Sequence, residues 1–531
     1  MGMTEKIVPL PQRVTPSGGE VLRLGSAPRV AVPSESLREL GEVVVDLLRR
    51  LHRVEPVLVV GGEGDLTLGL TQEPPDADIA GVQGIDPLDE DHPSREVYGL
   101  DVREDGAAVT ASSAEGLFRG ATTFAQLLRP EAGGGFTVPG VRIVDGPAMA
   151  WRGLSLDVVR CFFTVEQVKK VIDLLALYKF NVLHLHLSDS QAWRLEIAGW
   201  PRLTGGGSTG ADDLPSYTRD DYREIVGYAA ARFITVVPEL DMPGHVLAAV
   251  RAYPELRGDG EPPHKWLAYL DPRAEVTFRF VRDVLGELAA LTPGPYLHVG
   301  GDEAFGMPEE LYGEFVARAL EIARATGKKV VGWQETARSG ALTPADVAQA
   351  WIGAGDEFDL DAARAKTPAE YHPLLDIVAE TFARSAGDVP AAVAAGVPVL
   401  ASASSVMYLD RRYAEGSLRA GQTARRTEVG HDSYTPRTCR ELFDWAPGTL
   451  TEIPDGARLA GVEAAIWCET VEDFDDLVFL LLPRLPGIAE KAWTPSRTDW
   501  DAYRGRVAAH AHWWDRLGLD GYYRSAEVFG P

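Results

Sequence analysis

The chain has 531 residues, of which 45% are hydrophobic and 24% are charged, as is usual for a globular protein. This length exceeds one ordinary core, so we expect two or three domains, one of them a large barrel. With 78 acidic against 52 basic residues the net charge is −26, which argues against nucleic acid or an anionic membrane as a partner.

Three cysteines, Cys161, Cys439 and Cys468, are widely spaced and form no CxxC pattern, so they predict no disulfide framework. The first residues, MGMTEKIVPLPQRV, lack the apolar core of a signal peptide. No run approaches the ~20 apolar residues that a membrane span requires. We therefore expect a cytoplasmic protein, or a secreted one if a leader has been removed.

Residues 1–146 predict a small α+β domain. An amphipathic helix is expected over residues 34–52, between the short strands PRVAV and LTLGL. The segments YGLDV and AAVTA, joined around Asp105-Gly106, predict a hairpin. A helix over AEGLFRGATTFAQLL then leads into the glycine-rich GGGFTVPG, which suggests a domain boundary.

From Trp151 onward, strand and helix patterns alternate. Helical patterns such as 165–178 and 309–323 separate most of the apolar, β-branched runs. These runs predict eight strands: 153–159, 182–188, 234–240, 296–300, 329–333, 347–351, 397–402 and 462–467. The fold class is therefore α/β, with a (β/α)8 TIM barrel over residues 147–500. Residues 501–531 are expected to form a helical segment packed on the barrel.

Polar and aromatic residues gather where the predicted strands end, which is where a barrel carries its active site. Tryptophans end strands five, six and eight, and together with carboxylates and an arginine they favour sugar recognition. An indole face suits the apolar face of a pyranose, and the charged groups suit its hydroxyls. Asp157 and Glu239 fit a structural role equally well, so we leave them outside the catalytic set.

His184 and His186 form an HxH pattern on the second strand, and such a pair can hold a divalent ion. No clear further histidine pair accompanies them. Alternating residues of a buried strand share one face, so a histidine satisfied inside the barrel is the better explanation. We therefore expect no metal.

Asp302 and Glu303 follow the buried run YLHVGG. Both can reach one pocket only if the backbone turns, and Gly300 and Gly301 permit that turn. Neighbouring carboxylates resist double ionisation, which equips a general acid with an electrostatic partner. A retaining glycosidase, however, usually sets its acid and its nucleophile about 5 Å apart on different strands. We therefore assign Glu303 as the acid/base and Asp302 as the residue that steers a nucleophile other than a protein side chain.

The motif HVGGDEA closely resembles the active-site signature of the family 20 glycoside hydrolases, the β-N-acetylhexosaminidases. The resemblance covers nearly the whole chain, and the N-terminal α+β domain is similar to the family's usual companion domain. Six further blocks match in order: RGLSLDVVR, NVLHLHLSDSQAWRLEI, VVPELDMPGH, VVGW, VEAAIWCET and PRLPGIAEKAWTP.

The resemblance implies that the 2-acetamido carbonyl of the substrate attacks the anomeric carbon and forms an oxazolinium intermediate. Glu303 would protonate the leaving oxygen and later activate water, and Asp302 would orient the acetamido group. Tyr408 would hydrogen-bond the acetamido oxygen, and Asp189 and His245 would form a relay to Glu303. The implied substrate-binding residues are Arg160, Trp333, Trp351, Asp410, Trp467 and Glu469. No metal or organic cofactor is implied.

Two positions and one segment depart from the family pattern. Cys161 stands where the family usually has histidine, and Asp189-Ser190 replaces the common aspartate pair. The segment 352–396 has an acidic, helical pattern and is longer than many relatives carry. A lid, a subsite wall and a dimer contact all suit it.

The prediction is an exo-acting β-N-acetylhexosaminidase that releases terminal GlcNAc or GalNAc from oligosaccharides or glycoconjugates. Its expected partner is a carbohydrate, with no nucleic acid and no membrane, and a homodimer is one expectation for its assembly. The alternatives are a disaccharide-releasing enzyme of the lacto-N-biosidase kind, a metal-dependent TIM-barrel amidohydrolase and a catalytically silent sugar-binding protein.

Overall fold

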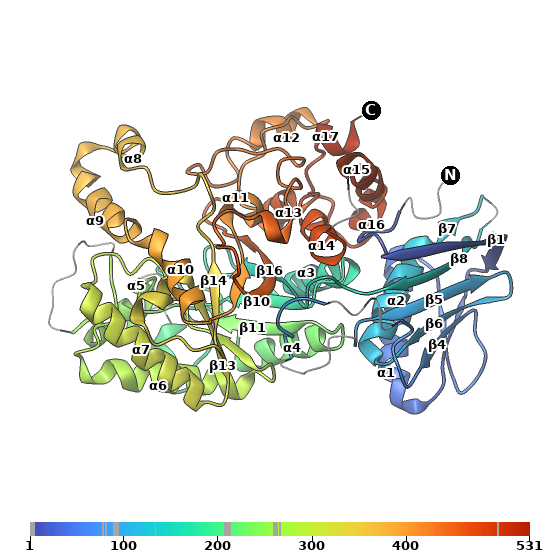
Figure 1. Ribbon diagram of the computed structural model, residues 1–531, viewed down its shortest axis with the longest axis horizontal. Helices are drawn as coiled ribbons and strands as arrows, with labels where there is room; N and C mark the ends of the chain where they lie inside the picture. The colour runs from blue at the N-terminus through green and yellow to red at the C-terminus, as the bar shows by residue number, and fades with distance from the viewer. Residues whose placement is uncertain are drawn as a thin grey trace.

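The computed structural model describes residues 6–76, 79, 82–88, 95–132, 134–205, 214–258, 264, 267–495 and 499–530. These residues form an N-terminal sheet domain and a closed barrel, and helices near the C-terminus lie beside both (Figure 1). Among the helices of the described ranges, none combines the length and the apolar character needed to cross a membrane.

The N-terminal domain is a mixed sheet with two helices, α1 (Arg38–His52) and α2 (Ala114–Leu127), packed on it. The strands follow the order β1 (Arg13–Leu24), β8 (Phe136–Asp145), β5 (Tyr98–Arg103), β6 (Gly106–Ala111), β4 (Leu66–Leu70), β2 (Arg29–Val32) and β3 (Val57–Val60), and β7 (Arg129–Pro130) pairs with β8. The expected hairpin is β5–β6. The expected first helix begins as a 3-10 turn, η1 (Glu35–Leu37).

The expectation that GGGFTVPG marks a domain boundary is wrong. The backbone N–H of Glu131 donates to the carbonyl of Gly135 at 3.1 Å, and Gly135 has a φ of +84°, so the chain turns back there. Phe136 then begins β8, which lies between β1 and β5 in the sheet and pairs with both. Glycine serves a tight turn between strands at this place, and the domain continues through it.

The barrel consists of eight parallel strands, which confirms the predicted (β/α)8 architecture. Each expected run overlaps one strand, and the ring closes where β16 pairs with β9. The strands are β9 (Trp151–Asp157), β10 (Val182–His186), β11 (Thr235–Glu239), β12 (Tyr296–His298), β13 (Lys329–Trp333), β14 (Val347–Ala350), β15 (Val399–Ala401) and β16 (Leu459–Ile466).

The interior of the barrel is apolar at one end and polar at the other. Side chains alternate along a strand with a period of two, so Val182, His184 and His186 share one face of β10. Val182 belongs to an apolar layer with Trp151, Val237, Tyr296, Val331, Val347, Leu400 and Ala460. The polar residues come later in each strand, so they face the loops at the carboxyl ends.

Helices surround the barrel and link its strands. The α-helices are α3 (Val165–Leu177), α4 (Arg219–Ala230), α5 (Leu247–Ala252), α6 (Glu275–Leu291), α7 (Glu309–Ala325), α10 (Asp388–Ala394), α11 (Ser404–Met407), α12 (Ala420–Arg425), α13 (Phe474–Leu481) and α14 (Leu485–Trp493). Short 3-10 helices occupy Pro201–Leu203, Pro254–Arg257, Gln334–Ser339, Ala369–Tyr371, Ser385–Gly387 and Pro447–Thr449.

The last helices are α15 (Trp500–Ala508), α16 (Ala511–Arg516) and α17 (Ala526–Phe529). They contact the end of α3 through Tyr178, whose hydroxyl accepts from the Trp514 indole at 2.8 Å and bonds His510 Nδ1 at 2.8 Å.

Two helices stand away from the barrel. These are α8 (Leu360–Lys366) and α9 (His372–Phe382), which project at the upper left in Figure 1 and contain no buried residue. The next helix, α10, does bury Val389 and Ala392 against the barrel. The helical pattern expected for residues 352–396 is therefore confirmed, and only its first part projects.

Candidate active site

The eleven residues predicted to form the site all lie at the carboxyl ends of barrel strands. Trp333 is the last residue of β13, and the others lie on the loops that follow their strands. They are Arg160 after β9, Asp189 after β10, His245 after β11, Asp302 and Glu303 after β12, Trp351 after β14, Tyr408 and Asp410 after β15, and Trp467 and Glu469 after β16.

The turn before Asp302 depends on its two glycines. Gly300 has a φ of +68°, and a Cβ built on it would lie 1.7 Å from Asp241 Oδ1. Gly301 has a φ of +109°, and its Cβ would meet Thr336 Cγ2 at 2.3 Å. Gly301 N–H also donates to Asp241 Oδ1 at 3.1 Å. The glycines therefore permit the turn, as the sequence predicts, and they also leave room for Asp241, a neighbour that the sequence does not reveal.

Replacing Gly300 with alanine should destabilise the fold and abolish any activity of this site. The left-handed backbone and the clash with Asp241 together should lower the free energy of unfolding by about 2–4 kcal/mol. Urea unfolding and an activity assay would measure both effects. Gly313→Ala on α7 is the matched control, because a Cβ built there would meet no atom of the described residues within 4 Å, apart from its chain neighbours and its own helix backbone. An unchanged stability for Gly300→Ala would contradict this account of the turn.

Asp302 and Glu303 meet at one histidine. His245 Nε2 lies 3.6 Å from Asp302 Oδ2 and 3.3 Å from Glu303 Oε2. Both distances are those of ion pairs, although neither contact has the geometry of a hydrogen bond. Glu303 has a φ of 49° and His245 a φ of 54°, a conformation that side-chain-bearing residues rarely adopt. Strained backbone of this kind concentrates at functional sites. Both residues are thus fixed in place by the turns that carry them.

The carboxyl of Asp302 holds its proton more tightly than an ordinary aspartic acid. Burial and the neighbouring carboxylate of Asp241 raise the pKa of Asp302 well above its usual value of 3.8. Burial also raises the pKa of Asp241 to about 7. The sequence argument made Glu303 the carboxyl group that retains its proton. In the structure, burial and Asp241 raise the pKa of Asp302 instead.

Asp189 joins three cationic groups. Its carboxylate forms an ion pair with Arg160 Nη2 at 2.7 Å, and it accepts from His186 Nε2 at 3.0 Å and from His245 Nδ1 at 3.1 Å. Burial alone would raise the pKa of Asp189, but Arg160 and His245 hold it well below 3.8. The expected contact between Asp189 and His245 is therefore present in the geometry.

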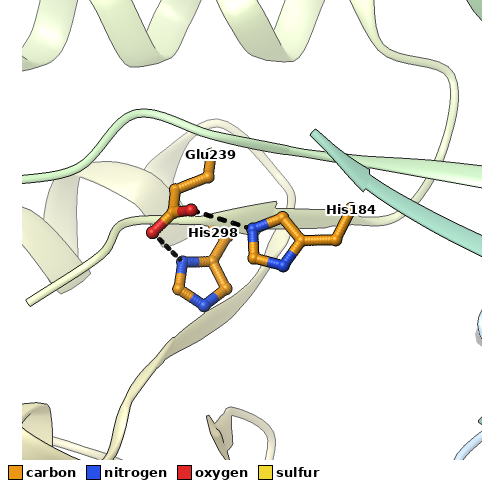
Figure 2. A group of neighbouring side chains, drawn as sticks. All are labelled: His184, Glu239 and His298. Atoms are coloured by element: carbon orange, nitrogen blue, oxygen red, sulfur yellow. Dashed lines mark hydrogen bonds and ion pairs between the residues drawn. The ribbon is translucent and has the colours of Figure 1, made fainter. Parts of the chain in front are cut away.

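Glu239 lies at the centre of the polar interior, and Figure 2 shows its contacts with two histidines. Its carboxylate lies 3.0 Å from His184 Nε2 and 3.1 Å from His298 Nδ1. It also accepts from His186 Nδ1 at 2.6 Å and from the Trp333 indole at 2.8 Å. Glu239 therefore orients groups that reach the site, and its side chain is fully buried.

The three residues of Figure 2 also have the spacing of a metal site, with ligand atoms within 4.8 Å of one another. However, both ring nitrogens of His184 already have carboxylate partners. Nε2 lies 3.0 Å from Glu239, and Nδ1 lies 2.9 Å from Glu463. Nδ1 of His298 accepts from Gly300 N–H at 3.0 Å. A metal ion would have to displace these bonds. The hydrogen-bonded arrangement fits a metal poorly, and the absence of a metal stays a prediction.

Treatment with EDTA should therefore leave hydrolytic activity unchanged, because the chemistry that the family resemblance implies uses no metal. Metal analysis of the purified protein and an assay before and after dialysis against EDTA would check this. A stoichiometric metal, or a loss of activity that Zn²⁺ restores, would favour the amidohydrolase alternative.

The predicted aromatic walls come together. The ring centroids of Trp333 and Trp467 are 5.8 Å apart, those of Trp467 and Tyr408 are 6.1 Å apart, and those of Tyr408 and Trp351 are 6.3 Å apart with nearly parallel planes. Trp351 donates its indole N–H to Glu335 at 3.1 Å. The four aromatic residues thus form one continuous cluster, in which Trp333 and Tyr408 are buried.

Arg160 is held firmly in spite of the unusual Cys161. The guanidinium contacts Asp157 at 3.3 Å and Asp189 at 2.7 Å, and it lies 3.7 Å from Glu469. Asp157 also accepts from three backbone N–H groups of the loops after β9 and β16, which supports a structural role. Burial raises the pKa of the Cys161 thiol to about 11, so that thiol is a poor nucleophile.

Asp410 is buried, and within the described part of the chain no other side chain donates a hydrogen bond to either of its carboxylate oxygens. Burial is the main cause that raises the pKa of Asp410 to about 8, and the nearby carboxylate of Glu469 is the second cause. A buried carboxyl group without such a partner is costly, so a donor on a bound ligand would find a ready acceptor here.

Sequence reasoning missed several residues around the site. Glu335 supports Trp351 and, like Asp302, is buried with a pKa raised by burial. Glu463 accepts from the Trp151 indole at 2.9 Å and from Gln349 at 3.0 Å. The signal that could have found Glu463 is its position among apolar neighbours in VEAAIW, where a charged residue must find a partner.

Comparison with known protein families gives matches to two family descriptions. "Glycosyl hydrolase family 20, catalytic domain" matches residues 149–308 and 306–496. "Glycosyl hydrolase family 20, domain 2" matches residues 4–146. Together these descriptions span the N-terminal sheet domain and the barrel.

Individual proteins are similar over the full length. A β-N-acetylhexosaminidase of Cellulomonas fimi is 38% identical and aligns over 99% of this chain and 97% of its own. The structure of a Streptomyces plicatus N-acetyl-β-hexosaminidase in complex with Thio-NAglucal has a TM-score of 0.80 at 36% identity, covering 98% of this chain and 97% of that chain. A β-N-acetylhexosaminidase of Streptomyces coelicolor A3(2) has a TM-score of 0.80 at 37% identity and covers 99% of both chains.

Proposed function

Because the chain belongs to glycosyl hydrolase family 20, we propose that it is an exo-acting β-N-acetylhexosaminidase with a retaining, substrate-assisted mechanism. Full-length similarity to β-N-acetylhexosaminidases supports the activity. A mutant of the Streptomyces plicatus enzyme with a TM-score of 0.81 has been described in complex with the product GlcNAc, which supports an N-acetylhexosamine as the sugar bound.

One observation carries the mechanism: Asp302 and Glu303 lie on the same side of the site. Both carboxylates are within 3.6 Å of His245 Nε2. A side-chain nucleophile would need to sit about 5 Å from the acid, across the sugar, on another strand. Asp302 does not meet that requirement. A nucleophile carried by the substrate, its 2-acetamido oxygen, removes the need for one.

In this mechanism Glu303 donates a proton to the leaving oxygen while the acetamido oxygen attacks the anomeric carbon. Asp302 accepts the acetamido N–H and stabilises the positive charge that develops on the nitrogen of the oxazolinium ion. Glu303 then removes a proton from the water that opens the ring. Tyr408 donates to the acetamido oxygen, and Asp189 and His245 form the relay that keeps Glu303 in place.

The remaining residues bind the sugar. Trp333, Trp351 and Trp467 surround the acetamido group, and Arg160, Asp410 and Glu469 bind the hydroxyls. Asp410 and Glu469 close the pocket around a single residue, which favours exo release over release of a disaccharide. Terminal GlcNAc and GalNAc are both proposed as substrates. The cytoplasmic location and the homodimer stay predictions, which cell fractionation and sedimentation would test.

The test is hydrolysis of 4-nitrophenyl N-acetyl-β-D-glucosaminide beside the matching plain β-glucoside. Only the acetamido sugar should be cleaved, and a thiazoline mimic of the oxazolinium ion should block the reaction. Cleavage of the plain glucoside without inhibition by the thiazoline would overturn the proposed role of Asp302. Cleavage of neither sugar would favour the disaccharide-releasing or silent alternatives.

A further inference from the structure

A row of aromatic rings continues from the candidate active site onto the segment that contains the projecting helices α8 and α9. Trp351, one of the residues proposed to surround the acetamido group, contacts Phe382 at the end of α9 with ring centroids 5.9 Å apart. Phe382 stacks on Phe358 at 5.6 Å and 12°, and it lies 6.0 Å from Phe305. We call Phe305, Phe358 and Phe382 the aromatic shelf. Two of its three rings come from the segment that projects in Figure 1.

The aromatic shelf lies beside the acid/base residue. Phe305 is two positions after Glu303, and its backbone N–H donates to the Glu303 carbonyl at 2.5 Å. Glu303 is the residue proposed to protonate the leaving oxygen, so its side of the pocket is the side on which the leaving group departs. The shelf therefore lies next to the loop that carries the proposed proton donor.

The three rings remain partly open to solvent. Each is half-buried, and no residue of α8 or α9 is buried. Half-exposed aromatic rings beside a pocket are costly to leave in water unless a ligand covers them.

The segment that carries two of these rings is anchored at both ends. At its start, Asp356 pairs with the buried Arg411 and accepts from Ser404 Oγ at 2.7 Å. At its end, Arg338 makes two hydrogen bonds of 2.7 Å to Asp388. Held in this way, the rings can present a surface that is in place before a ligand arrives, which lowers the entropic cost of binding.

The negative charge of this segment favours a neutral molecule as the ligand of the aromatic shelf. Residues 352–387 contain seven acidic and three basic residues, and the whole chain has a net charge of −26. Contact between this acidic segment and the same segment of a second copy would bring like charges together, which disfavours a second copy as the occupant of this face. A neutral pyranose meets no such penalty, and its apolar face stacks on an aromatic ring.

We propose that the aromatic shelf binds the leaving-group sugar, so that this enzyme favours substrates in which the terminal N-acetylhexosamine is β-linked to another pyranose. This inference rests on the proposed function. It gives the first part of the segment 352–396, residues 352–387, the role of a subsite wall, which is one of the three roles suggested for that segment by its sequence. The shelf selects the leaving group, and the pocket behind it selects the terminal sugar.

The test compares two substrates with the same terminal sugar. One is the β-1,4-linked dimer of GlcNAc, and the other is 2,2,2-trifluoroethyl N-acetyl-β-D-glucosaminide, whose leaving group has no ring. Phe382→Ala and Phe358→Ala should raise KM for the dimer about ten-fold, the effect of losing one favourable ring contact, and leave KM for the trifluoroethyl glycoside unchanged. Phe358→Tyr keeps the ring and should keep the wild-type KM.

Ile377→Ala on the same helix is the matched control, because Ile377 is half-buried and lies outside the shelf. It should change neither substrate. An equal loss on both substrates would mean that the shelf only supports Trp351, and an unchanged KM for the dimer would mean that it contacts no leaving group. Either result overturns the inference while the function stands. If the wild-type protein cleaves neither substrate, the proposed function itself fails.

Discussion

Replacing Glu303 with glutamine should lower kcat/KM by about 10²–10⁴-fold on substrates with a poor leaving group, the usual contribution of a general acid. The amide has nearly the same shape but cannot donate a proton to the leaving oxygen. A leaving group such as 4-nitrophenolate needs little protonation, so its release should be impaired far less. The ratio of the losses on the two kinds of substrate is the quantity to measure.

Glu310→Gln is the matched control for this change. Glu310 is exposed on the first turn of α7, seven positions after Glu303, and its replacement should leave both substrates unaffected. An equal loss across leaving groups for Glu303→Gln would show that Glu303 does not act as the proton donor.

Replacing Asp302 with asparagine should lower kcat/KM by about 10²–10³-fold whatever the leaving group, as expected for the loss of one preorganised electrostatic stabiliser. Asparagine can still accept the acetamido N–H, but it supplies no negative charge to the nascent oxazolinium ion. A series of aryl N-acetyl-β-glucosaminides of different leaving-group pKa measures this directly. Asp220→Asn on the surface of α4 is the control, since its carboxylate is almost fully exposed.

The same variant should change the pH profile. Burial and Asp241 raise the pKa of Asp302, and the ionised form is the one that stabilises a positive charge. Activity of the wild-type protein should therefore fall as the pH drops through this raised pKa, above the usual range of a carboxyl group. In Asp302→Asn this acidic limb should disappear. An acidic limb that persists in the variant would assign it to another group.

The barrel was predictable because each of its strands is an apolar run that ends in polar residues. KVVGW matches β13 residue for residue, and the other runs differ from their strands only at the ends. Such runs are a local signal that one sequence carries. The N-terminal sheet was less accessible. Gly135 and β8 follow a glycine-rich stretch whose role as an internal turn depends on pairing with β1, more than a hundred residues earlier.

For the site, the residue types and their strand ends were predictable, but the contacts between them were not. The two glycines before Asp302 predicted the turn, while the group that occupies the space they leave, Asp241, comes from another strand. Burial, and after it the carboxylate of that distant neighbour, raises the pKa of Asp302. The carboxylate of Glu239 contacts four residues on three strands, which no local pattern reveals.

The central claim is that the nucleophile belongs to the substrate, and its most direct test varies that nucleophile alone. Four aryl glycosides would carry acetyl, monofluoroacetyl, difluoroacetyl or trifluoroacetyl groups on the 2-amino nitrogen. Each fluorine withdraws electrons from the carbonyl oxygen and weakens its attack on the anomeric carbon. The account predicts that log kcat/KM falls steeply along this series. A rate that is independent of the fluorine content would contradict it and point to a nucleophile on the protein.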